Sequence, residues 1–221
     1  MLGRVPTFRM KVFLSYSHLD KRLAGKIKRC LQQYGVNAFL AHNDIEPSEE
    51  WIDRILKELR NCDVFMPILT KYFNRSKWTD QETGCALVLK KLIFPLKIDV
   101  DPHGFISRYQ AHSLKTNDLP GSVCAVLQIL SKKPKVGDLV RDALIEVFSS
   151  SESFRSAKRN TERLLSFKGF NMDQVKKIIQ YTINNDQIHR CFAAQRPLRD
   201  FAYGYKKKLN VRLYQKLLHL I

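Results

Sequence analysis

The chain has 221 residues, of which 44% are apolar, and a formal net charge of +17. This apolar share is enough for a packed core and excludes a disordered chain. No apolar run approaches the roughly 20 residues that span a bilayer. Five cysteines, an odd number with no CxxC pair, argue against a zinc site or a disulfide framework. No apolar N-terminal stretch resembles a signal peptide. We therefore expect a cytoplasmic protein that does not associate with membranes, and we expect no metal.

The first elements alternate between strand and helix. Residues 11–16, KVFLSY, form a β-prone run, and apolar positions at helical spacing follow from Leu23 to Tyr34. Asp20 is placed to cap this helix at its start, and Gly35 is placed to end it. Residues 36–40, VNAFL, are predicted to be the second strand.

The same alternation continues through the next seventy residues. A helix is expected to begin after Ser48, and the near-continuous apolar run 62–69 has the pattern of a strand covered on both faces. The segment SKWTDQETG, residues 76–84, opens a third helix that runs to about Lys90. Residues 92–98 and 112–116 are predicted to be the fourth and fifth strands.

Strands that alternate with helices through short connections predict an α/β fold, a flavodoxin-like doubly wound sheet of five parallel strands. Ligands of such sheets bind beyond the C-terminal ends of the strands. The loops expected there are residues 17–20, 41–49 and 70–78. None of them contains GxGxxG or GxxxxGK[ST], so neither a Rossmann pyrophosphate turn nor a Walker phosphate loop is indicated.

Beyond the Pro-containing linker 131–135, apolar positions recur only at helical spacing. Helices are predicted at residues 138–148, 153–167, 173–184 and 198–220. We expect two domains, an α/β domain over residues 1–132 and a small all-α domain over residues 136–221.

The charge is divided unequally, with +6 on residues 1–130 and +11 on residues 131–221. A basic surface of this kind attracts polyanions, so a nucleic acid or an acidic partner is one expectation, and a solvated basic face is the alternative.

The segment SKWTDQETG permits two interpretations. Thr79 and Glu82 match the T-x-x-E capping box, in which the threonine hydroxyl and the glutamate carboxylate bond to the first backbone amides of a helix. If the helix instead begins near Ser76, Trp78 and Glu82 stand four residues apart on one face, close to the expected crevice. An indole beside a carboxylate supplies a stacking surface and a group that stabilises an oxocarbenium-like centre, as carboxylates do in glycoside cleavage.

Three other residues have structural alternatives. His18 follows the first strand and is either a ligand contact or an ordinary loop histidine. His42 and Asp44 are too few to form a metal site, so we interpret them as polar loop residues. Cys85 lies one turn beyond Glu82 but is followed by apolar residues and has no obvious base, which favours core packing over nucleophilic chemistry.

Together, FLSYSHLD (residues 13–20), DIEPSEEW (44–51) and SKWTDQE (76–82) resemble the first box, the BB loop and the S-x-W-x-x-x-E segment of TIR domains. The resemblance covers about residues 10–130. Many TIR domains hydrolyse or cyclise NAD and depend on the glutamate that corresponds to Glu82. The resemblance therefore implies Glu82 as the catalytic residue, NAD as substrate and no cofactor. It also implies the following residues as the walls of the substrate pocket: Trp78, Tyr16, Ser17, His18, Asp44 and Ile45.

The same resemblance implies partners and context. TIR domains self-associate, often with the BB loop of one molecule against the pocket of the next, so we expect a homo-oligomer when active and a regulatory or oligomerising helical domain. Prokaryotic antiviral immunity is implied in the same way. Two non-enzymatic alternatives remain open at this point: a scaffold that binds other TIR domains, and a nucleic-acid-binding regulator that acts through the basic C-terminal region.

Overall fold

The computed structural model describes residues 10–41 and 51–221. They form two compact units, one of residues 10–127 and one that includes residues 128–221, so the division falls inside helix α5 (Leu119–Leu130). The sequence had suggested a linker a few residues later, at 131–135. Each unit is described by itself.

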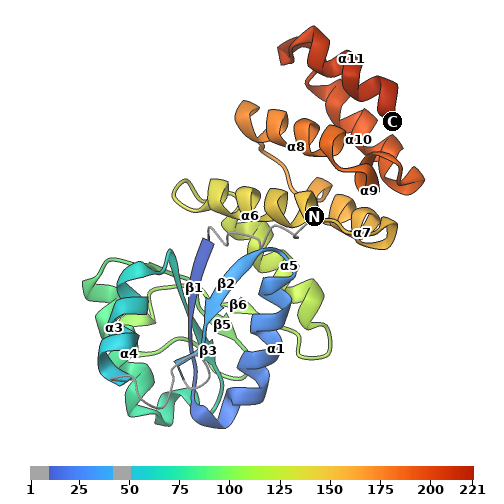
Figure 1. Ribbon diagram of the computed structural model, residues 1–221. Helices are drawn as coiled ribbons and strands as arrows, with labels where there is room; N and C mark the ends of the chain where they lie inside the picture. Colours follow the sequence, from blue (N-terminus) through green and yellow to red (C-terminus); the bar gives the residue numbers. More distant parts are fainter. Residues whose placement is uncertain (1–9, 42–50) are drawn as a thin grey trace. The chain divides into compact units, whose positions relative to one another are not determined.

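The first unit is built around a parallel sheet (Figure 1). Strand β1 (Met10–Ser15) is central and pairs on one side with β2 (Val36–Phe39) and on the other with β3 (Val64–Leu69). Beyond β3 lie β4 (Leu92–Ile93), β5 (Leu96–Lys97) and, at the edge, β6 (His112–Ser113).

The expected fourth strand is interrupted. β4 pairs with the first half of β3 and β5 with the second half, and Phe94 and Pro95 lie between them. Proline has no backbone N–H to donate to a ladder, which explains a break at this position. If β4 and β5 are counted as one interrupted strand, the sheet has five strands. Numbered along the chain, these strands lie in the order 2-1-3-4-5 across the sheet. This is the flavodoxin-like order, so the predicted fold class is confirmed.

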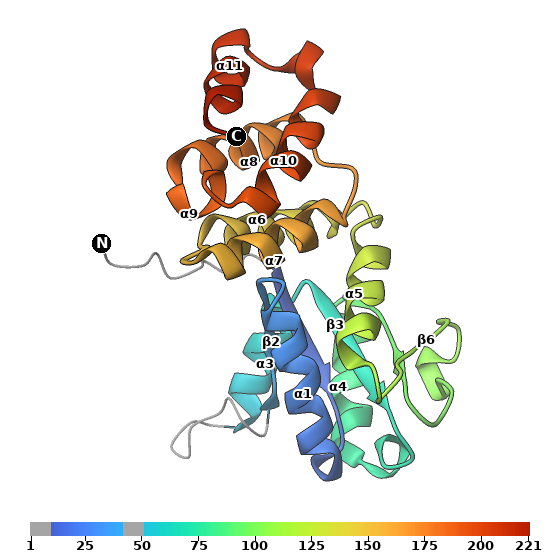
Figure 2. The ribbon, with the colours of Figure 1, turned by 90° about the vertical axis from the view of Figure 1, so that its right-hand side faces the viewer.

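Helices cover both faces of the sheet. Helices α3 (Trp51–Asn61) and α4 (Lys77–Val88) lie on one face, and α1 (Lys21–Gln32) and the start of α5 lie on the other (Figure 1). Figure 2 shows α1 in front of the strands. Phe13 and Phe65 belong to a buried cluster that includes residues of α3 and α4, so their side chains lie on that face of the sheet. Their rings stack within this cluster, with centroids 5.8 Å apart.

The turn between α1 and β2 needs a glycine. Gly35 has a φ of +75°, in the left-handed region that side chains with a Cβ rarely adopt. The backbone amides of Tyr34 and Gly35 still bond to carbonyls of the last turn of α1, at 2.9 and 3.0 Å. The predicted end of this helix is therefore confirmed.

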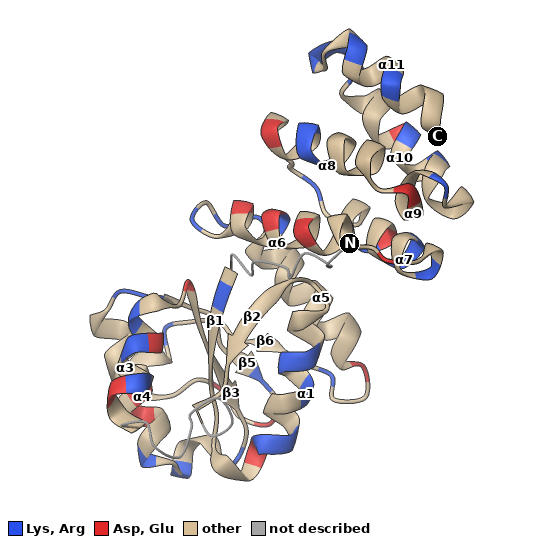
Figure 3. Ribbon diagram, viewed as in Figure 1, with Lys and Arg blue, Asp and Glu red and all other residues tan. Residues whose placement is uncertain are grey.

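The second unit is all helical. Its helices are α6 (Gly137–Ser149), α7 (Phe154–Leu165), α8 (Met172–Asn184), α9 (Asp186–His189), α10 (Phe192–Gly204) and α11 (Val211–Leu220). Lysine and arginine positions, blue in Figure 3, occur along α7, α8, α10 and α11. The single helix predicted over residues 198–220 was wrong. The chain leaves α10 at Gly204, and Asn210 starts α11 by accepting hydrogen bonds from the amides of Arg212 and Leu213.

None of the helices in the described part of the chain is both long enough and apolar enough to cross a membrane.

Candidate active site

Polar residues are buried where β1 and β3 end. Ser15 is the last residue of β1, Thr70 directly follows β3, and Glu82 lies in the second turn of α4. Each of the three is less than 9% exposed. Buried polar groups in an apolar core are informative because their burial is costly unless they are hydrogen-bonded. They mark the edge of the sheet at which a ligand is expected.

Glu82 is bound to the central strand. Ser15 Oγ donates a hydrogen bond of 2.5 Å to Glu82 Oε2, and this bond joins residues 67 positions apart in the sequence. Glu82 is 6% exposed. The position of the carboxylate is therefore set by both α4 and β1, which gives it the fixed placement that a catalytic group requires.

Burial raises the pKa of Glu82 to about 7, and the hydrogen bond from Ser15 opposes this rise by stabilising the ionised form. Near neutral pH, both the acid and the carboxylate forms of Glu82 are therefore populated. A carboxyl group with such a pKa can stabilise a cation when ionised, and it can also accept and release a proton near neutral pH.

The capping-box interpretation of Thr79 and Glu82 was wrong. Helix α4 begins at Lys77, and Ser76, with extended backbone angles, precedes it. Thr79 is already inside the helix, and its hydroxyl lies within hydrogen-bond distance of the backbone carbonyls of Phe73 (2.9 Å) and Ser76 (2.7 Å). The helix starts three residues too early for a capping box, so Trp78 and Glu82 stand four residues apart within it.

Trp78 and Glu82 line the same pocket, between α3 and α4. Its volume is about 130 Å³, and Ile52 and Leu56 of α3 form the opposite wall. Trp78 lines this pocket and is 42% exposed, so part of its side chain remains open to solvent.

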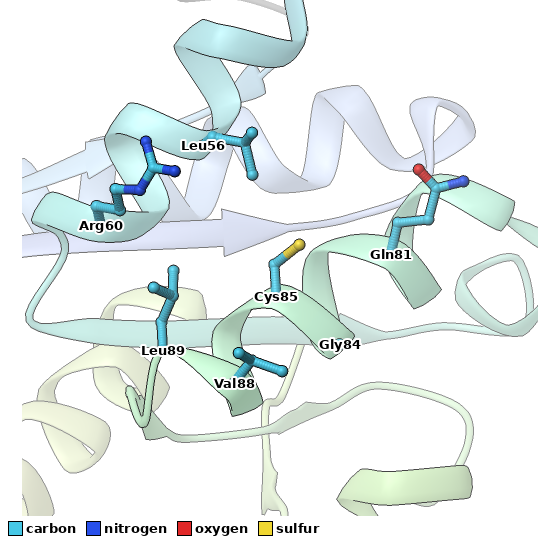
Figure 4. Close-up of a pocket in the computed structure, with 7 residues that line it drawn as sticks. All are labelled: Leu56, Arg60, Gln81, Gly84, Cys85, Val88 and Leu89. Atoms are coloured by element: carbon cyan, nitrogen blue, oxygen red, sulfur yellow. The ribbon is translucent and has the colours of Figure 1, made fainter.

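The pocket continues along the two helices into a larger cavity of about 520 Å³. Figure 4 shows Leu56 of α3 and Cys85 of α4 projecting into the space between the helices. Gln81, Cys85 and Leu56 line both spaces, which makes them one groove. Cys85 packs against the core, as expected, but is only partly buried and also faces this groove.

The segment after β1 supplies less to this pocket than expected. Tyr16 and Ser17 are each 3% exposed, and His18 is exposed at the start of a short 3₁₀ turn, His18–Asp20. None of these three residues lines the pocket that contains Glu82. Asp44 and Ile45 lie outside the described residues. The structure therefore brings together Trp78 and Glu82, and it leaves the assignment of the other predicted pocket residues as a prediction.

Sequence reasoning missed two hydrogen-bonded pairs at this edge. One is Ser15 with Glu82. The other is Thr70 with Asp20: Thr70 Oγ1 donates a bond of 2.5 Å to Asp20 Oδ2, so this side chain does not cap α1 as predicted. Burial raises the pKa of Asp20. The available signal was the polar residue at the end of each strand, since Ser15 interrupts an apolar run and Thr70 directly follows one.

No group of three or more His, Cys, Asp or Glu side chains arranged to hold a metal ion occurs among residues 10–41 and 51–221.

Comparison with known proteins identifies the fold family. The family model described as "TIR domain" matches residues 12–122, about half of the chain. A search of curated proteins found no match.

Among solved structures, the TIR domain of the Toll-related receptor TRR-2 from Hydra magnipapillata has 15% identity and a TM-score of 0.46, covering 55% of this chain and 95% of that domain. The TIR domains of the Roq1 resistosome that recognises the pathogen effector XopQ have 16% identity and a TM-score of 0.40, covering 79% and 98%. The CMP N-glycosidase BcmB from Clostridium botulinum has 16% identity and a TM-score of 0.38, covering 51% and 97%.

Proposed function

The chain belongs to the TIR domain family, and from this premise we propose that it cleaves the bond between nicotinamide and ribose in NAD, with Glu82 as the catalytic carboxylate. The proposal includes hydrolysis and cyclisation, which share the bond-breaking step. One observation carries it: Glu82 is a buried carboxyl group with a pKa of about 7, and it shares a pocket with the half-exposed indole of Trp78.

The chemistry suits a single carboxylate. When the bond between ribose C1′ and the nicotinamide nitrogen breaks, its electron pair goes to the pyridinium nitrogen and neutralises the ring. The leaving group therefore needs no proton, and a second acid such as those of most glycosidases is not required. The ribose is left with an oxocarbenium-like positive charge. The ionised form of Glu82 stabilises this charge in a site from which water is largely excluded.

The second step supplies a nucleophile to C1′. If water attacks, the products are ADP-ribose, nicotinamide and one proton, and Glu82, with its pKa of about 7, is suited to accept that proton. If a nitrogen of the substrate's own adenine attacks, the product is a cyclic isomer. Trp78 supplies a flat apolar surface on which an aromatic ring of the substrate can stack.

The positive charge of the nicotinamide ring acts on Glu82 as well. A cation close to a carboxyl group lowers its pKa, and this opposes the effect of burial. Substrate binding thus favours the ionised form that the bond-breaking step uses, and Ser15 favours the same form through its hydrogen bond.

Assembly is the second part of the proposal. As in other TIR domains, self-association is expected to regulate activity, and the helical unit of residues 128–221 is a candidate for promoting it. This unit contains most of the chain's excess positive charge, including the consecutive exposed lysines 206–208. A polyanion, such as a nucleic acid, is the partner that such a surface would attract.

The experiment that tests this function is direct. Purified protein is incubated with NAD at low and high protein concentration, and nicotinamide, ADP-ribose and cyclic isomers are resolved by mass spectrometry. Turnover per molecule that rises with protein concentration supports an assembly-dependent NAD-cleaving enzyme. Absence of turnover at every concentration, with and without added DNA or RNA, would favour a non-enzymatic scaffold.

A further inference from the structure

A second cavity lies on the other side of α4 from Glu82. It has a volume of about 280 Å³ and is enclosed by α4 and by the segment that contains the short 3₁₀ turn Gly104–Ile106. Thr83, the residue after Glu82, lines it. Successive helix residues are about 100° apart around the axis, which is why neighbours in the sequence face different cavities. Its volume is just below the range of about 300–1,000 Å³ that is usual for drug-sized ligands, which favours a small ligand.

Two residues that line this cavity each have a buried polar atom without a hydrogen-bond partner in the described part of the chain: Thr83 Oγ1 and His103 Nδ1. Thr83 as a whole is 8% exposed. A buried threonine in a helix ordinarily donates to the carbonyl four residues earlier, as Thr182 does to Ile178 at 2.9 Å. An unsatisfied buried hydroxyl lowers stability, so its presence in a cavity calls for an explanation.

The walls of the cavity favour a flat ring. Two phenylalanines line it, of which Phe73 is almost fully buried and Phe105 is 82% exposed. The imidazole of His103 meets Phe73 edge-on, with centroids 6.4 Å apart and an interplanar angle of 81°. Aromatic side chains that line a pocket in this way offer stacking and edge contacts to a planar ligand.

The charged residues at the cavity disfavour anions. Asp80 is exposed at the rim, and its Oδ1 lies 3.7 Å from Nε2 of His103. No lysine or arginine is among the residues that line this cavity. A phosphate or carboxylate group would therefore meet the carboxylate of Asp80 with no lysine or arginine in the lining to offset it, whereas an amino or amide N–H would find an acceptor in Asp80.

We propose that this cavity binds a neutral or cationic planar nitrogen heterocycle that carries an amino or carboxamide group. Thr83 Oγ1 and His103 Nδ1 bond to the polar edge of the ring, Asp80 accepts from its N–H groups, and Phe105 covers its face. The site shares Gly84 with the groove between α3 and α4 but neither Glu82 nor Trp78, and its existence does not depend on the proposed function.

The test uses the full chain labelled with ¹⁵N and three probes: nicotinamide, adenine and benzoate. We expect one or both heterocycles to shift the amide resonances of Thr83, Gly84 and Gly104. Benzoate, a planar anion, should bind at least tenfold more weakly. No shift at these amides with either heterocycle, equal binding of benzoate, or shifts confined to the neighbourhood of Trp78 would each overturn the proposal.

Two matched variants complete the test. Thr83→Val keeps the side-chain shape and removes the hydroxyl, and Thr161→Val does the same to another buried threonine whose Oγ1 also lacks a partner in the described chain. Both variants should have an unchanged or higher melting temperature, but only Thr83→Val should weaken binding, by tenfold or more. Glu82→Gln should leave binding at this cavity unchanged. Equal binding by wild type and Thr83→Val would contradict the proposal.

Discussion

Ser15, the last residue of the central strand, donates a hydrogen bond of 2.5 Å to Oε2 of Glu82 on α4. This bond links the end of the sheet, where ligands of doubly wound folds bind, to the residue that the TIR family resemblance assigns to catalysis. It also lowers the pKa of a carboxyl group that burial has raised. The bond and the burial together determine how much of Glu82 is ionised, so stability and activity should both depend on pH through this residue.

The first prediction concerns stability. The pKa of Glu82 in the folded protein, about 7, lies above its ordinary value of 4.5. The folded protein therefore binds a proton at this carboxyl group more tightly than the unfolded chain does. The contribution of Glu82 to the free energy of unfolding is therefore fully present below pH 4.5. It is lost as the pH rises through about 7, and the total loss is roughly 3 kcal/mol. Glu82→Gln removes this loss, because glutamine has no carboxyl group to ionise. Urea unfolding should therefore show the variant more stable than wild type at pH 8 and nearly equal at pH 4.5.

The control for this measurement is Glu58→Gln on α3. Glu58 forms a partly exposed ion pair with Arg54 at 3.2 Å and does not line the Glu82 pocket. Its stability difference from wild type should be small and vary little over the same pH range. A Glu82→Gln difference that does not change with pH would contradict a raised pKa.

The second prediction concerns Ser15→Ala and the pH profile of NAD cleavage. Wild-type kcat/KM should rise with pH through about 7 as Glu82 ionises. Loss of a hydrogen bond to the carboxylate should move this rise upward by roughly 1–2 pH units, because such bonds contribute about 1.5–3 kcal/mol. At pH 7 the variant should be about tenfold slower, and at pH 9 it should approach wild type. An equal loss at every pH would show that Ser15 does not act through the ionisation of Glu82.

The third prediction concerns Trp78. Its side chain is 42% exposed, so Trp78→Ala should lower the free energy of unfolding by no more than about 1–2 kcal/mol. Loss of the stacking surface should raise the KM for NAD about tenfold or more. Trp78→Phe, which keeps an aromatic ring, should retain most of the affinity. A KM unchanged in both variants would remove Trp78 from the substrate pocket.

The fourth prediction concerns lysines 206–208, which form a short 3₁₀ turn between α10 and α11. If these side chains contact the phosphates of a nucleic acid, replacing all three with glutamine should weaken binding in low salt. It should also reduce the slope of log K against log salt by about 2–3, close to one for each phosphate that the variant no longer neutralises. Fluorescence anisotropy with a labelled duplex over a salt series measures both. Identical slopes for wild type and variant would indicate a solvated basic face.

Much of the fold could be predicted because its signals are local. The apolar runs of β1 and β3 and the helical spacing of α1 and α3 each lie within a dozen residues, and the predicted parallel sheet was confirmed. Two errors arose where a local pattern was incomplete. Pro95 divides a strand that looked continuous, and Gly204 and Asn210 divide a helix whose apolar spacing continues across the break.

The site was less accessible to sequence reasoning because its bonds are long-range. Ser15 and Glu82 are 67 residues apart, and Thr70 and Asp20 are 50 apart, so no local pattern pairs them. The T-x-x-E pattern at Thr79 was misleading for the opposite reason. It matches the local capping rule, but the helix begins at Lys77, before Thr79. The Thr79 hydroxyl instead lies near the backbone carbonyls of Phe73 and Ser76.

The central claim is that the Glu82 carboxylate breaks the bond to nicotinamide. The most direct test measures nicotinamide release from NAD by wild type, Glu82→Gln and Glu58→Gln at pH 7.5 and at matched high protein concentration. We predict activity in wild type and Glu58→Gln, and a loss of at least a hundredfold in Glu82→Gln, whose folded state should be at least as stable as wild type at this pH. Glu82→Gln activity equal to that of wild type would contradict the account, and Glu82 would then be a structural partner of Ser15 alone.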